Sequence, residues 1–126
     1  MSHGPVHESS LSSQIDAAAQ ALESQVIAWR RDLHAHPELA FEEHRTASLV
    51  AHKLQAWGYD VTTGLGGTGV VGRLRRGQGS KTMGIRADMD ALPIAEQGTM
   101  QWKSTTPDKM HACGHDGHVA MLLAAA

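Results

Sequence analysis

The stretch Leu-Val-Ala-His-Lys-Leu-Gln-Ala-Trp-Gly-Tyr-Asp-Val-Thr-Thr at residues 49–63 contains the change of pattern that decides the fold class. Before Gly58, apolar side chains recur every three or four positions and share one face, as in an amphipathic helix. After Gly58 the chain changes to short runs of aromatic and β-branched residues, which favour strands. A glycine at such a junction is typical of a helix C-terminal cap. We therefore predict an α/β fold.

Helices are predicted on both sides of this junction. The same periodicity predicts a first helix from Gln14 to about His36, where Pro37 disfavours further helix. The second helix is predicted over residues 41–57, with two glutamates in its first turn, where the helix dipole favours them. A third apolar helix is expected from about residue 119.

Three strands are predicted after the second helix, over residues 59–63, 70–74 and 81–88. Glycine-rich breaks separate them, as tight turns require. We expect residues 70–74 and 81–88 to pair as a hairpin. A long connection over residues 89–113 then leads to the third helix.

Domain organisation is simple, since 126 residues allow one small domain at most. Residues 1–13 are predicted to be a flexible N-terminal tail, and residues 14–126 part of one folded domain. The third helix reaches Ala126 without a stop signal, so we expect the chain to be truncated.

Composition narrows the partners and the compartment. A net charge of -2 argues against nucleic acid or an anionic membrane as a partner. No apolar run approaches the roughly 18 to 20 residues that span a bilayer. The sequence has one cysteine and no signal-like start, so we predict a cytoplasmic protein.

The chemistry concentrates in His-Ala-Cys-Gly-His-Asp-Gly-His at residues 111–118. Side chains two apart in an extended segment face the same side, so Cys113 and His115 are the candidate metal ligands. Thiolate and imidazole suit zinc, and imidazole also accepts manganese, nickel or cobalt. His118 and Asp116 are candidates for orienting the site, and Asp116 is also a candidate helix cap.

Two other interpretations of Cys113 stay open at this point. A free cysteine is commonly a small buried apolar residue. It can also be a nucleophile, with His111 or His115 as its base, which would make the protein a thiol enzyme.

Two further clusters carry polar side chains. Asp88 and Asp90 follow a predicted strand and can bind a cation, orient a ligating histidine or lie in solvent. His34 and His36 have metal-like spacing, but they precede Pro37 at a helix end, where polar packing and helix termination are the preferred interpretation.

Three motifs in order carry a family resemblance: residues 32–43 (Asp-Leu-His-Ala-His-Pro-Glu-Leu-Ala-Phe-Glu-Glu), 86–94 (Arg-Ala-Asp-Met-Asp-Ala-Leu-Pro-Ile) and 110–118 (Met-His-Ala-Cys-Gly-His-Asp-Gly-His). Together they resemble the N-terminal third of the metal-dependent amidohydrolases. This zinc-peptidase-like family includes aminoacylases, hippurate hydrolases and plant auxin-conjugate hydrolases. The resemblance covers nearly everything after the tail.

The resemblance implies the N-terminal part of a three-layer α/β catalytic domain, cut before an inserted lid that often carries a homodimer contact. It implies a site for two divalent ions (Zn, Mn, Ni or Co), with Cys113 and His115 as ligands and Asp90 orienting them. Asp88 stands where a related branch has a ligating histidine. The implied reaction hydrolyses N-acyl amino acids such as hippurate.

No catalytic residue is assigned within this chain, because the general-base glutamate is expected beyond residue 126. The chain alone is therefore expected to have little or no activity. The alternative function is a non-catalytic metal-binding or interaction module.

Overall fold

The computed structural model describes residues 10–126, which contain three helices and one two-stranded sheet. In chain order these are α1 (Leu11–Ala35), α2 (His44–Ala56), β1 (Asp60–Leu65), β2 (Gly69–Arg73) and α3 (His115–Ala125). The predicted tail lies outside the described residues as far as position 9, and α1 already begins at Leu11. None of these helices is long and apolar enough to cross a membrane.

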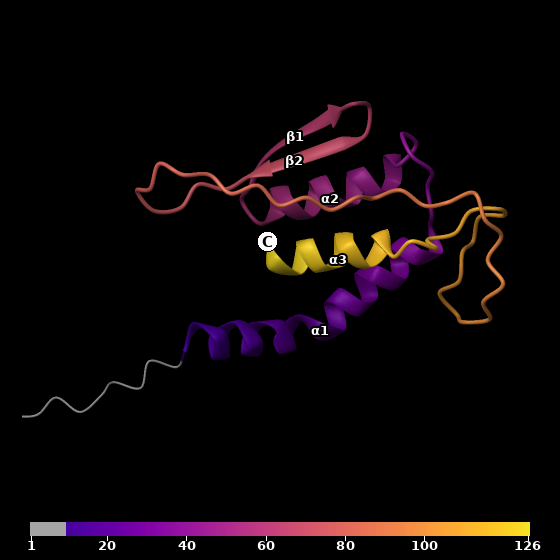
Figure 1. Ribbon diagram of the computed structural model, residues 1–126, viewed down its shortest axis with the longest axis horizontal. Coiled ribbons are helices and arrows are strands. Elements are labelled where there is room, and N and C mark those ends of the chain that lie inside the picture. The colour runs from indigo at the N-terminus through magenta and orange to yellow at the C-terminus, as the bar shows by residue number, and fades with distance from the viewer. Residues whose placement is uncertain (1–9) are drawn as a thin grey trace, which may run out of the picture.

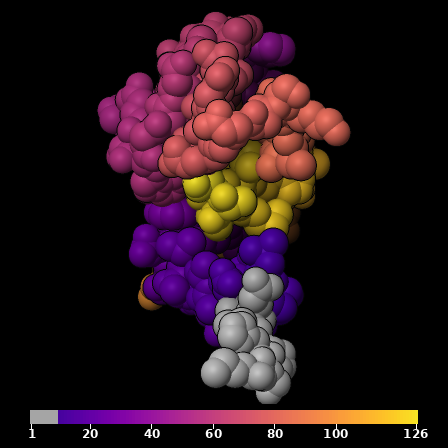
Figure 2. Space-filling view, turned by 90° about the vertical axis from the view of Figure 1, so that its left-hand side faces the viewer, coloured from indigo at the N-terminus to yellow at the C-terminus, as the bar shows by residue number. Residues whose placement is uncertain are grey.

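Helix α3 lies between α1 and α2, and the β1–β2 hairpin covers α2 on its other side (Figure 1). The buried core joins Leu33 of α1 to Val119 and Leu123 of α3, with partly buried apolar residues of α1, α2 and the segment after β2 around them. In Figure 2 the end of α3 reaches the surface between α1 and the segment that follows β2. This packing places the first turn of α3 beside the end of α1.

Helix α2 begins at His44, three residues later than predicted. The reason is Phe41, whose φ of 65° is left-handed and incompatible with a helix start. The first turn of α2 is capped from a distance by Glu38, whose carboxylate accepts the main-chain N–H groups of Arg45 and Thr46 at 2.8 and 2.7 Å. The helix ends as predicted, with Gly58 at a φ of 88°.

The predicted hairpin was wrong in its pairing. β1 and β2 pair antiparallel, with Thr62 opposite Val71, and a tight turn containing Gly66 and Gly67 joins them. Residues 81–88, predicted as a strand, form no ladder with any described residue and remain extended, with Met83 and Ile85 exposed. The short turn suits pairing of strands that are neighbours in the sequence, as β1 and β2 are.

The extended segment after β2 crosses the helices and leads to the site (Figure 1). Its end is fixed by two isolated bridges, Leu39 with Ala91 and Leu92 with Met110. The Ala91 N–H donates to the Glu38 carbonyl at 2.7 Å. These contacts hold the segment just before residue 91 against the start of α3.

Candidate metal site

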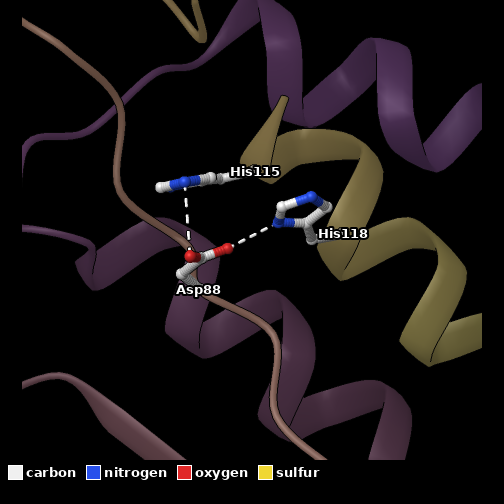
Figure 3. A group of neighbouring side chains, drawn as sticks. All are labelled: Asp88, His115 and His118. Carbon is white, nitrogen blue, oxygen red and sulfur yellow. Dashed lines mark hydrogen bonds and ion pairs between the residues drawn. The ribbon is translucent and has the colours of Figure 1, made fainter. Parts of the chain in front are cut away.

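Asp88 faces two imidazoles from the first turn of α3 (Figure 3). His118 Nδ1 lies 2.6 Å from Oδ1 of Asp88, and His115 Nε2 lies 3.3 Å from Oδ2. The two histidines share a helix face because they are three residues apart. Their rings stack with centroids 5.4 Å apart. The fold thus gathers one carboxylate and two imidazoles from segments about thirty residues apart.

Asp90 holds His115 from the other side of its ring. Nδ1 of His115 lies 2.9 Å from both the main-chain oxygen and Oδ1 of Asp90. Both of these atoms accept hydrogen bonds, so Nδ1 is the donor, which leaves Nε2 directed towards Asp88. A histidine that binds a metal usually donates its second ring N–H to a carboxylate or carbonyl in this way.

The charges and donor atoms of the group suit a divalent cation. The hydrogen bond from His118 lowers the pKa of Asp88 and the charge of His115 adds to this, although desolvation opposes them. Asp88 is therefore ionised at neutral pH. One donor atom each from Asp88, His115 and His118 lies within 4.8 Å of the others. Imidazole and carboxylate groups are donors that divalent first-row transition ions accept.

Cys113, the other residue predicted to be a ligand, is exposed and lies outside this group. Gly114, in a left-handed conformation with φ of 81°, separates it from His115. The thiol-enzyme interpretation would favour a hydrogen bond between Cys113 and His111 or His115. Within the described residues there is none. The buried apolar interpretation of Cys113 is wrong, because its side chain is exposed.

Asp116 lies inside the first turn of α3, whose N-cap is Gly114, so the capping interpretation is wrong. Its side chain is buried, and Oδ2 lies 2.8 Å from His34 Nδ1 and 3.0 Å from Arg30 Nε. Burial alone would raise the pKa of Asp116, but His34 and Arg30 together hold it below its usual value. Asp116 thus anchors α3 to α1.

His34 and Glu96 were not predicted to belong near the site. His34 Nε2 lies 2.8 Å from Oε1 of Glu96, and the main-chain N–H of Ser104 donates to the same carboxylate. Polar packing was the preferred interpretation of His34, and the ring is indeed buried among polar partners. The partners lie 62 and 82 residues away in the sequence, so no local pattern could identify them.

His111 is buried, and both of its ring nitrogens lack a hydrogen-bond partner within the described residues. Burial is the main cause that lowers its pKa, so the ring is neutral at pH 7. Its ring centroid lies 6.4 Å from that of His34. His111 therefore belongs to the polar interior behind the candidate metal site.

Known proteins are similar to this chain in sequence and in fold. Residues 84–126, which include both aspartates and all of α3, match the family model described as peptidase family M20/M25/M40. The N-acyl-L-amino acid amidohydrolase of Geobacillus stearothermophilus is 49% identical over 90% of this chain and 30% of its own length. The hippurate hydrolase of Campylobacter jejuni is 53% identical over 77% of this chain and 25% of its own length.

Solved structures agree. An aminohydrolase from methicillin-resistant Staphylococcus aureus superposes with a TM-score of 0.82 at 40% identity, over 87% of this chain and 29% of that one. The Bacillus subtilis YXEP protein, a dinuclear metal binding peptidase from the M20 family, gives 0.77 at 38% identity, over 82% and 29%. The predicted α/β class is confirmed, and the fold is that of part of a metallopeptidase catalytic domain.

Residues 84–126 thus match the M20 peptidase family, and most of the chain is similar to an amidohydrolase and to a dinuclear metal binding peptidase of that family. The predicted family resemblance is thereby confirmed. The chain spans about 30% of the length of the first curated relatives it matches.

Proposed function

We propose that the protein represented by this chain hydrolyses the amide bond of N-acyl amino acids of the hippurate type, releasing a carboxylic acid and an amino acid. The similarity to enzymes named for this activity supports the substrate class. The observation that carries the proposal is the position of His115, held by Asp90 through Nδ1 and facing Asp88 through Nε2. An imidazole fixed in this way is ready to bind an ion without further rearrangement.

The proposed ligands within this chain are Cys113 and His115. Asp90 orients His115 through its ring Nδ1. Asp88 and His118 are hydrogen-bonded to each other beside His115, and Asp116 holds α3 against His34 of α1. Two divalent ions (Zn, Mn, Ni or Co) are proposed, in line with the dinuclear B. subtilis relative. When bound, such ions supply Lewis acidity that polarises an amide carbonyl and favours deprotonation of water.

No residue of this chain is assigned as the general base, and the remaining ligands are proposed to lie beyond residue 126. We therefore expect the chain by itself to have little or no hydrolytic activity. The intact enzyme is proposed to be cytoplasmic and homodimeric, to take small-molecule substrates, and to bind neither nucleic acid nor a membrane. The single cysteine supports the cytoplasmic compartment, and the net charge of -2 argues against nucleic acid and an anionic membrane. The homodimer and the small-molecule substrates are what the family resemblance implies.

The test compares this chain with the full product of its reading frame, using hippurate and other N-acyl amino acids with and without a chelator. The expected result is metal-dependent hydrolysis by the full product, restored by adding a divalent ion and lost on His115→Ala. Hydrolysis that survives the chelator but not a thiol-blocking reagent would favour the thiol enzyme. Metal binding without hydrolysis in the full product would favour the non-catalytic module.

A further inference from the structure

We propose that His34 is a positioning residue that ties the first turn of α3, and with it His115, to the loop that follows Asp90. The proposal rests on the proposed function, because it gives His34 a task in holding the metal site together. His34 is supplied by the first of the three sequence motifs, which places no side chain in the Asp88–His115–His118 group. The structure thus gives that motif a role at a distance from the group.

The geometry places His34 between two carboxylates. Its ring is 2% exposed, with Nδ1 2.8 Å from Asp116 Oδ2 and Nε2 2.8 Å from Glu96 Oε1. A carboxylate oxygen accepts hydrogen bonds, and either imidazole nitrogen can carry the donating hydrogen. His34 therefore bridges two buried carboxylates, with one ring nitrogen on each.

Both carboxylates have a second polar partner besides His34. Arg30 Nε lies 3.0 Å from Oδ2 of Asp116. The main-chain N–H of Ser104 donates to Glu96, and together with His34 it holds the pKa of Glu96 below its usual value although burial would raise it. The bridge is thus one connected polar network.

Both carboxylates bridged by His34 lie close in sequence to residues of the candidate metal site. Asp116 directly follows His115, so holding its carboxylate fixes the rotation of the first turn of α3. Glu96 lies in the loop six residues after Asp90. This loop is also fixed to the end of α1, where Thr105 donates its main-chain N–H and its hydroxyl to the Ala35 carbonyl at 2.9 and 2.7 Å.

Orientation is a better account of this network than stability alone. Removing charges from water is costly, and a buried ion pair is often no more stabilising than apolar residues of the same volume. A charged bridge nevertheless demands one arrangement, because any other leaves a charge unpaired. The neighbouring His111 does not take part in this network, since neither of its ring nitrogens has a hydrogen-bond partner within the described residues.

The test compares His34→Gln with His36→Gln, a matched control two residues away whose side chain is 40% exposed and whose Nδ1 lies 2.8 Å from the Asp32 carbonyl. The first readout is the ring ¹⁵N chemical shifts of His115 in the metal-free chain. The second readout is the affinity of the full product of the reading frame for Co²⁺, followed by absorbance. We expect His34→Gln to shift the His115 signals and to weaken Co²⁺ binding about tenfold, the lower end for residues that orient a ligand. His36→Gln should change neither.

Glu96→Gln is the second variant, because it neutralises the far end of the bridge and leaves Asp116 and α3 intact. It should shift the same His115 signals. If His34→Gln does not fold, this variant tests the positioning role of His34 in its place. Unmoved His115 signals in a folded variant would overturn the proposal. A wild-type full product that does not bind Co²⁺ would count against the ligands in the proposed function, while the metal-free spectra would still test His34 separately.

Discussion

Nδ1 of His115 lies 2.9 Å from Oδ1 of Asp90 and equally close to its main-chain oxygen, across 25 residues of sequence. Two acceptors from one residue hold the imidazole in a single orientation. The second ring nitrogen then faces Asp88. This contact joins the extended segment to α3 and organises the candidate metal site in the protein without an ion.

Replacing Asp90 by alanine should weaken metal binding while the fold persists. The main-chain oxygen remains as an acceptor, but the carboxylate that helps to fix the orientation of the His115 ring is lost. We expect about 10- to 100-fold lower affinity for Zn²⁺ in calorimetric titration. Asp60→Ala is the control, because Asp60 is 75% exposed on β1. Equal affinities for the two variants would contradict the orienting role.

Replacing Glu38 by alanine should destabilise the start of α2. Its carboxylate accepts two main-chain N–H groups and the Thr46 hydroxyl, so the loss resembles removal of a helix cap. The expected cost is about 1–2 kcal/mol in the free energy of unfolding, measured by urea denaturation. Glu42→Ala, at a side chain 62% exposed, should cost much less. An equal cost for both would contradict the capping role.

Replacing Leu33 by alanine should open a cavity between α1 and α3. Leu33 is fully buried against Val119 and Leu123, so the expected loss is about 2–5 kcal/mol in the free energy of unfolding. Leu11→Ala, at a side chain 73% exposed, serves as the control and should lie within about 0.5 kcal/mol of wild type. A small effect at Leu33 would show that these helices do not share a core.

Low pH should reduce the free energy of unfolding, because Glu96 becomes protonated. The folded protein holds the pKa of this group below its ordinary value of 4.5, because the Ser104 N–H and His34 outweigh the effect of burial. A lowered folded pKa contributes stability that is complete above about pH 4.5 and is lost as the pH falls through the folded value. Urea denaturation at a series of pH values should show this loss, and Glu96→Gln should flatten it. An unchanged slope in the variant would contradict the assignment.

Local patterns predicted most of the helical structure. The stripe of α1 and the glycine after α2 follow from spacing and backbone preference, which neighbours in sequence determine. The start of α2 was misplaced because the left-handed conformation of Phe41 carries no sequence signal. Strand partners were misassigned because pairing depends on which segments meet in space, and residues 81–88 meet no described strand.

The residues of the candidate site could also be predicted only in part from the sequence. The motif spacing identified His115 and both aspartates as candidates, because metal ligands cluster in sequence. It could not reveal that Asp88 contacts His118, or that His34 reaches Asp116, since these contacts depend on how α1 packs on α3. Long-range polar contacts need the fold before they can be seen.

The most direct test of the central claim is the divalent metal content of the full product of this reading frame after dialysis against Zn²⁺, compared for wild type, His115→Ala and the exposed control His52→Ala. Our account predicts that wild type and His52→Ala retain the ion and that His115→Ala loses it. Retention by His115→Ala at the wild-type level would contradict the account.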